Sequence, residues 1–142
     1  MTIRNVIFGS LTAYMLIALP SNLFAVEMDE IHKGTELFKT YCSACHGEKA
    51  IGQDPNQPAG GWDAEEKRLA PALNGTGHAW HHPPKLLFEY IQKGSIDKTS
   101  PMPSFEAVLN DDQIEEIITY IYSLWPDKIR TLYKKRFTEN KE

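Results

Sequence analysis

The feature of this sequence that most constrains its fold is the segment Cys-Ser-Ala-Cys-His at positions 42–46. It contains both cysteines of the 142-residue chain, and a histidine directly follows the second. In a helix, side chains three positions apart lie on the same side of one turn, so the two thiols would point the same way. Cys42, Cys45 and His46 would then offer two sulfur atoms and an imidazole to a single bound group.

Three other uses of paired cysteines fit this sequence less well. A zinc site needs a second pair of ligands at a suitable spacing, and the chain has no further cysteine. A thioredoxin-type dithiol lies in a βαβ context, and the sequence has no run of strand alternation. A structural disulfide fits poorly because cysteines this close in a helix usually serve redox or metal roles.

The segment matches the attachment signature of haem c. Each thiol adds to one vinyl group of the same porphyrin, and the histidine binds the iron as its proximal ligand. We therefore expect one haem c per chain, held covalently through Cys42 and Cys45, with His46 on the iron. The covalent bonds would keep the cofactor attached after export.

The first 25 residues have the composition of a secretory signal peptide. Arg4 is their only charged side chain, residues 6–19 are largely apolar, and the segment ends at the small residue Ala25. This order predicts cleavage after Ala25 and a mature chain, residues 26–142, that lies in the periplasm without a membrane span. An uncleaved N-terminal anchor is the alternative, although the apolar run is shorter than the roughly 20 residues of a spanning helix.

Composition and charge exclude several classes of protein. The chain is 42% hydrophobic and 24% charged, which excludes a wholly disordered chain and a polytopic membrane protein. Its 15 Lys and Arg against 19 Asp and Glu give a formal net charge of −4, which argues against a general nucleic-acid binder. The length of the mature chain suits one domain, residues 26–142.

Helical periodicity, interrupted by loops rich in glycine and proline, predicts an all-α fold with three main helices. Apolar and small side chains recur at helical spacing from residue 31 to residue 45, and Gly47 is placed to end that helix. A loop is expected from residue 48 to about residue 70. A second helix is expected over residues 84–92, with Gly94 after it.

The third helix has the clearest boundaries. Asn110 and Gln113 have the spacing of an N-cap residue and its capping-box partner. An apolar face then continues to residue 125, and Pro126 ends the helix. Residues 126–142 form a basic C-terminal extension, which we expect to be a helix packed on the body with a solvated basic face.

A second iron ligand is expected from a distant loop. Met102 lies between Pro101 and Pro103, which restrict the backbone of the loop, and a thioether ligand raises the haem potential. The competing interpretation of Met102 is a side chain that only fills the core. Three histidines are rival ligands that would lower the potential relative to methionine, and these are His78, His81 and His82.

With these motifs the chain resembles the class I cytochrome c family, in particular the monohaem c-type cytochromes of the bacterial periplasm. Gly34 and Phe38 stand eight and four residues before Cys42, as in the N-terminal helix of that family. Ile117 and Tyr120 occupy the matching places in its C-terminal helix. The resemblance implies a small cytochrome c fold, in which these two helices cross and three main helices surround the haem.

Two loops also match the family. The segment Ala-Pro-Ala-Leu at 70–73 looks like the loop whose proline carbonyl accepts the ring N–H of the proximal histidine, which implies that Pro71 orients His46. The segment Met-Pro-Ser-Phe at 102–105 matches the loop of the distal ligand. The resemblance therefore implies His46 and Met102 as the axial pair.

The segment Trp-His-His at 80–82 departs from the general family pattern. Trp80 would hydrogen-bond the haem propionates, or His81 and His82 would bind a transition metal such as copper. The simpler interpretation is an aromatic side chain at the haem edge beside two exposed histidines, because adjacent side chains in a loop rarely suffice for a specific metal site.

The resemblance implies a one-electron carrier and not an enzyme, a monomer that docks transiently with a redox donor and a redox acceptor. Two protein ligands on the iron would leave no position for a substrate. A haem peroxidase or gas-binding protein stays open if Met102 is absent from the iron, as does a metal-handling module at His81 and His82. The sequence also leaves open whether the domain docks to a larger respiratory complex.

Overall fold

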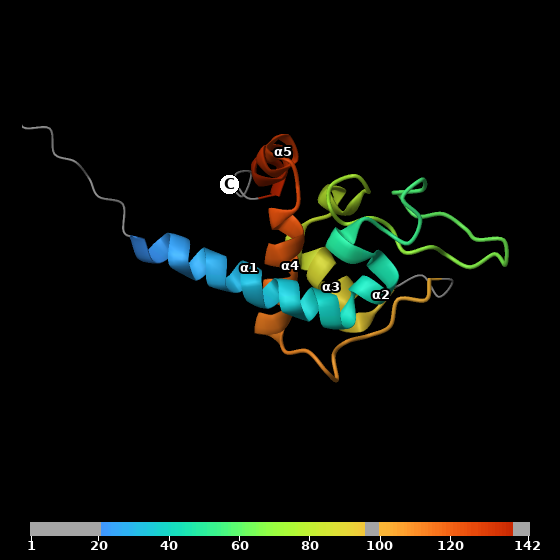
Figure 1. Ribbon diagram of the computed structural model, residues 1–142, viewed down its shortest axis with the longest axis horizontal. Helices are drawn as coiled ribbons and strands as arrows, with labels where there is room; N and C mark the ends of the chain where they lie inside the picture. Colours follow the sequence, from blue (N-terminus) through green and yellow to red (C-terminus); the bar gives the residue numbers. More distant parts are fainter. Residues whose placement is uncertain (1–20, 96–99, 138–142) are drawn as a thin grey trace, which may run out of the picture.

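The computed structural model describes residues 21–95 and 100–137, and its elements are helical (Figure 1). The helices are α1 (Ser21–Tyr41), α2 (Ser43–His46), α3 (Pro84–Lys93), α4 (Asp111–Ser123) and α5 (Asp127–Phe137), with 3₁₀ turns η1 (Glu48–Ala50) and η2 (Ala79–His81). Within the described residues, strand pairing is limited to one isolated bridge between Trp62 and Arg68. The predicted all-α fold is confirmed.

The most extensive packing contact joins α1 to α4 (Figure 1). At the crossing, Gly34 faces the backbone of Glu116, and a Cβ atom at position 34 would overlap the Glu116 carbonyl oxygen and lie 2.9 Å from the Cβ of Tyr120. Only glycine allows this approach. One turn later, the rings of Phe38 and Tyr120 pack with their centroids 5.2 Å apart. The predicted crossing of the two helices is confirmed.

The core lies between α1, α3 and α4. Phe38, Ile114 and Ile117 are its largest fully buried side chains, and Ile91 joins them from α3. Burying a side chain of this size stabilises the fold by roughly 1.5–3 kcal/mol. The core therefore fixes α1 immediately before the two cysteines.

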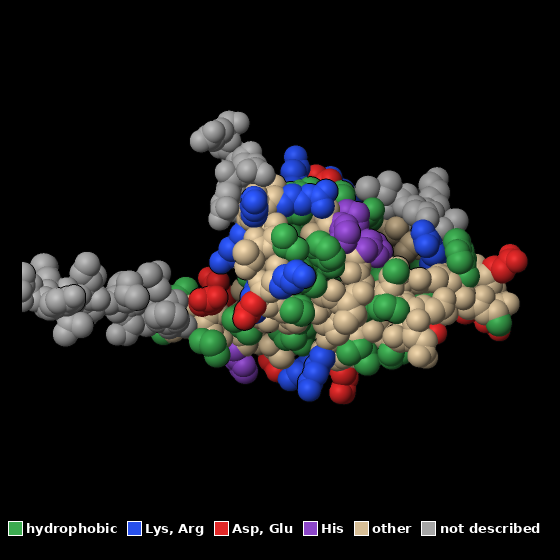
Figure 2. Space-filling model, turned by 90° about the horizontal axis from the view of Figure 1, so that it is seen from above, with side chains coloured by type: hydrophobic (Ala, Val, Ile, Leu, Met, Phe, Trp, Pro, Cys, Tyr) green, Lys and Arg blue, Asp and Glu red, His purple; other side chains and the backbone are tan. Residues whose placement is uncertain are grey.

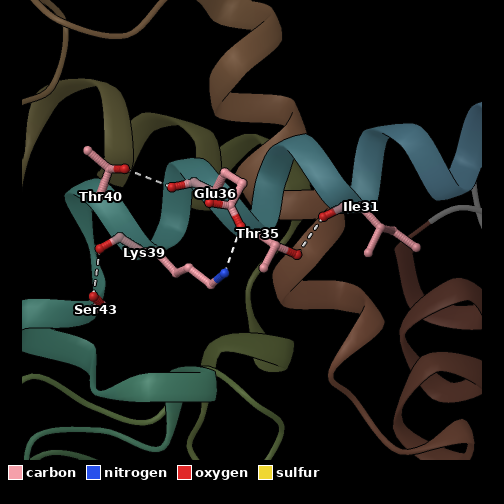
Figure 3. Close-up of polar contacts among 6 residues, drawn as sticks. All are labelled: Ile31, Thr35, Glu36, Lys39, Thr40 and Ser43. Carbon is pink, nitrogen blue, oxygen red and sulfur yellow. Dashed lines mark hydrogen bonds and ion pairs between the residues drawn. The ribbon is translucent and has the colours of Figure 1, made fainter.

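The first helix is interrupted at Cys42, which periodicity alone did not predict. Three hydroxyl groups along this segment donate to carbonyl oxygens one turn earlier, at 2.7–2.8 Å (Figure 3), and they belong to Thr35, Thr40 and Ser43. The bond from Ser43 to the Lys39 carbonyl lies where α1 ends and α2 begins. Such side-chain bonds bend helices. Gly47, with a φ of 74°, ends α2 as expected.

The other two predicted helices are present with small changes at their ends. α3 continues one residue further than expected, to Lys93, and Gly94 follows with a φ of 79°. α4 has the expected capping box, because the Asn110 side chain accepts from the Gln113 N–H at 2.9 Å and the Gln113 side chain accepts from the Asn110 N–H at 3.0 Å. It ends at Ser123, two residues earlier than expected.

The basic C-terminal extension forms α5 as far as Phe137, and residues 138–142 lie outside the described part of the chain. Tyr133 is buried against the body, and its ring packs with that of Trp125 at 4.8 Å between centroids. The exposed positions of the helix carry most of its positive charge, at Lys128, Lys134, Lys135 and Arg136.

The expected signal peptide falls mostly on residues 1–20, outside the described part of the chain. α1 begins at Ser21 and runs through the expected cleavage point after Ala25. Residues 25–30 are exposed, and this end of α1 extends away from the rest of the molecule (Figure 1). Among the described helices, none is long and apolar enough to cross a membrane. Cleavage after Ala25 stays a prediction.

Replacing Gly34 by alanine tests the closeness of the helix crossing. The added methyl group would overlap the backbone carbonyl of Glu116, so α1 and α4 would have to separate. We expect Gly34→Ala to lower the free energy of unfolding by about 2–3 kcal/mol, measured by denaturant unfolding followed by circular dichroism. The higher helix propensity of alanine alone would raise the free energy of unfolding by about 1 kcal/mol. The sign of the measured change therefore separates helix propensity from the steric overlap.

Glu30→Ala is the matched control for this measurement, because Glu30 is an exposed residue of the same helix. We expect its effect on the free energy of unfolding to stay within about 0.5 kcal/mol. A Gly34→Ala protein as stable as the parent would contradict the close crossing.

Candidate functional site

The site is organised around His46, the last residue of α2. The residue is buried, with 8% of its surface exposed, and its Nδ1 atom lies 2.8 Å from the carbonyl oxygen of Pro71. A carbonyl oxygen can only accept, so Nδ1 carries the hydrogen and donates it. Nε2 then keeps its lone pair, as a metal ligand requires. The loop around Pro71 therefore fixes both the orientation and the tautomer of the ring.

Backbone hydrogen bonds join the two segments that meet at His46. The N–H of Gly52 donates to the His46 carbonyl at 2.7 Å, and the N–H of Leu73 donates to the Ala50 carbonyl at 2.8 Å. Gly52 has a φ of 89°, and a Cβ atom there would lie 2.8 Å from the Ala72 nitrogen. The two segments run this close because position 52 is glycine.

A tryptophan beyond the end of α4 holds the other side of the same loop. Trp125 is 2% exposed, and its indole N–H donates to the Leu73 carbonyl at 2.7 Å. Leu73 lies two residues after Pro71, so the loop is fixed both at His46 and at Trp125. The sequence placed Trp125 on an apolar helix face but gave no signal for this contact, which joins residues 52 positions apart.

The two cysteines lie at the junction of α1 and α2 and are not joined in a disulfide. Cys42 is partly buried against the core, whereas Cys45 is exposed. Burial, with a smaller contribution from Cys45, raises the pKa of Cys42 to about 11, so this thiol is protonated near neutral pH. Burial lowers the pKa of His46 and so favours the neutral imidazole. The bond to Pro71 has a smaller, opposing effect.

Met102 lies in the loop that follows α3. It is partly buried and packs against the same core as Cys42. Its carbonyl accepts from the N–H of Ser95 at 3.2 Å, and the N–H of Phe105 donates to the carbonyl of Ile91, within α3, at 3.2 Å. These bonds anchor the loop at Met102 itself and three residues after it. Its role as an iron ligand stays a prediction.

Trp80 and its neighbouring histidines form a separate cluster at η2. The indole N–H of Trp80 donates to the Gly77 carbonyl at 3.0 Å, so this donor is engaged inside its own loop. The ring centroids of Trp80 and His81 lie 3.8 Å apart, and the ring centroids of His78 and His82 lie 5.5 Å apart. In residues 21–95 and 100–137, no group of three or more His, Cys, Asp or Glu side chains could hold a metal ion. The role of Trp80 toward haem propionates stays a prediction.

The residues around His46 fit a haem c. The two thiols lie three positions apart at the start of α2. The buried imidazole beside them donates its Nδ1–H to a carbonyl and keeps its Nε2 lone pair available. Of the residues predicted from the sequence, the structure joins His46 directly to Pro71 and packs Cys42 and Met102 against one core. Trp80, in η2, also packs against this core.

Comparisons with known proteins agree with this arrangement. The family model of cytochrome c oxidase, cbb3-type, subunit III matches residues 29–121. The crystal structure of cytochrome cL from the marine methylotrophic bacterium Methylophaga aminisulfidivorans is similar, with a TM-score of 0.55 and 25% identity, and the match covers 84% of this chain and 71% of that one. A search of curated proteins found no significant match.

The family match runs from within α1 to near the end of α4, and α5 lies outside it. It includes the thiol pair, His46, Pro71 and Met102. The resemblance to class I c-type cytochromes is thereby confirmed. Since well over half of its residues match, the chain belongs to the cbb3-type cytochrome c oxidase subunit III family and is a class I c-type cytochrome, a protein whose function is electron transfer by haem c.

Proposed function

We propose that this chain is a one-electron carrier in which Cys42 and Cys45 bind haem c and His46 and Met102 are the axial ligands of the iron. The observation that carries the proposal is the 2.8 Å contact between His46 Nδ1 and the Pro71 carbonyl, directly after the pair of thiols. This bond leaves the lone pair on Nε2 of the imidazole, which is the form that binds iron.

When bound, the haem supplies reversible one-electron chemistry between ferric and ferrous iron. The chain's own residues hold and adjust it. Pro71 accepts the His46 Nδ1–H, which fixes the ring and makes the imidazole a stronger electron donor. A thioether at Met102 favours ferrous iron and so raises the potential. Two protein ligands would close the iron to substrates, as a carrier requires.

The positions of the two thiols also suit electron exchange. Cys42 packs against the core and Cys45 is exposed, so a group attached to both would have one side buried and one side at the surface. Burial limits solvent reorganisation, and the surface side gives a partner protein access. A carrier of this kind docks weakly and briefly, because it must leave each partner quickly.

We further propose that the protein is exported to the periplasm after loss of residues 1–25 and works there as a monomer between a redox donor and a redox acceptor. The described helices do not contradict this, since none is long and apolar enough to cross a membrane. The matched family is named after a subunit of an oxidase, so a respiratory oxidase is the first class of partner to test.

Mass spectrometry of the exported protein tests the covalent attachment. We expect the mass of residues 26–142 plus one haem, and loss of the covalent haem in the Cys42→Ser/Cys45→Ser variant. Ala44→Ser is the control, because it changes an exposed residue between the cysteines and leaves both thiols in place. A parent mass equal to the bare processed chain would contradict the proposal.

The visible spectrum tests the axial ligand. We expect Met102→Ala to remove the far-red band of the ferric protein, to let the ferrous protein bind carbon monoxide, and to lower the midpoint potential by on the order of 0.1 V. Met28→Ala is the matched control, since Met28 is exposed on α1. A spectrum that survives Met102→Ala but changes in His81→Ala/His82→Ala would assign the ligand to a histidine instead.

A further inference from the structure

Positive charge is concentrated on α5, which packs beside η2. α5 contains five basic residues and one acidic residue, in a chain whose formal net charge is −4. Its one acid, Asp127, pairs with Arg130. In the described part of the chain, no ion pair neutralises the remaining four, Lys128, Lys134, Lys135 and Arg136. In Figure 2, Lys and Arg side chains gather beside a group of histidines on this face.

A groove lies between α5 and η2. It has a volume of about 320 Å³ and is lined by Trp80, Leu132, Tyr133, Lys135 and Arg136. Leu132 is 47% exposed although it is a large apolar side chain. Tryptophan, tyrosine and arginine are the residues most often found at the energetic centres of protein–protein interfaces. The groove thus combines an aromatic and apolar lining with two cations.

The histidines beside the groove lie in the positive field of α5. The His81 ring packs on Trp80 at 3.8 Å, and the His82 ring lies 5.5 Å from that of His78. Burial first, and then the charges of His78, His81 and Arg136, lower the pKa of His82. Cations that repel one another within one protein are stabilised when a partner supplies carboxylates.

The groove is also connected to the proposed haem site. Tyr133, in its lining, packs against Trp125 at 4.8 Å between ring centroids. The Trp125 N–H bonds to the Leu73 carbonyl at 2.7 Å, and Leu73 is two residues from Pro71, whose carbonyl lies 2.8 Å from His46 Nδ1. Covalent bonds, hydrogen bonds and ring contacts therefore lead from His46 to the groove, and electrons tunnel more readily along such a path than across empty space.

We propose that the groove between η2 and α5 is the docking site of a redox protein whose surface presents carboxylates. The inference rests on the proposed function, since the partner would gain one electron as the carrier loses one, or the reverse. A concave groove lined by Trp80 and Tyr133 fits a protruding protein segment better than a flat lipid surface. α5 lies outside the residues matched by the family model, so the cationic side of this site belongs to the chain's own extension, whereas η2 lies within the match.

Binding of poly-L-glutamate to the ¹⁵N-labelled holoprotein tests the site, with backbone amide shifts followed by NMR. We expect shifts confined to η2 and α5, and a dissociation constant about tenfold weaker for Lys135→Glu, which reverses a charge in the groove. Lys134→Glu is the matched control. Lys134 is the preceding residue of the same helix but lines another groove, beside Glu27 and Asp127, and its effect should stay within about twofold.

Equal weakening by both variants, or shifts centred elsewhere, would overturn the proposal in favour of nonspecific attraction. Phosphatidylglycerol vesicles provide a second probe: binding of the parent but not of Lys135→Glu would make the groove a lipid site and would also overturn it. Circular dichroism of both variants checks that they fold. Because these measurements need no electron transfer, failure of the docking site leaves the haem assignment intact, and failure of covalent haem attachment would appear separately by mass spectrometry.

Discussion

The close crossing of α1 over α4 at Gly34 is the contact on which the position of the site depends. Gly34 lets the two backbones approach so closely that no side chain fits between them, and Phe38 and Tyr120 then pack one turn further along. Phe38 is fully buried and lies four residues before Cys42. The crossing therefore delivers the thiol pair and His46 to one fixed place beside the core.

The loop that carries Pro71 makes this place into a ligand site. The carbonyl of Pro71 accepts from His46, and the carbonyl of Leu73, two residues later, accepts from Trp125, which lies two residues beyond α4. Both bonds come from buried side chains, where a lost hydrogen bond is costly. The orientation of the proposed iron ligand is thus tied to the helix that α1 crosses, and substitutions far from His46 along the sequence can disturb it.

The fold was predictable where short-range chemistry decides the structure. Helical periodicity located the helices, and the spacing of Asn110 and Gln113 located the start of α4, because a capping box involves only neighbouring residues. Helix ends were less predictable. At the break at Cys42 the Ser43 hydroxyl donates to the Lys39 carbonyl, and beyond the end of α4 at Ser123 the Trp125 side chain bonds to Leu73.

The sequence by itself determined the chemistry of the site, because two thiols and an imidazole within one turn are fixed by spacing alone. Through the family resemblance it also indicated which proline would meet His46. Only the tertiary structure decided the surroundings: the burial of Trp125 with its bond to Leu73, and the groove between η2 and α5 with its two cations. Those features join residues tens of positions apart, and local patterns carry no information about which distant segments a folded chain brings together.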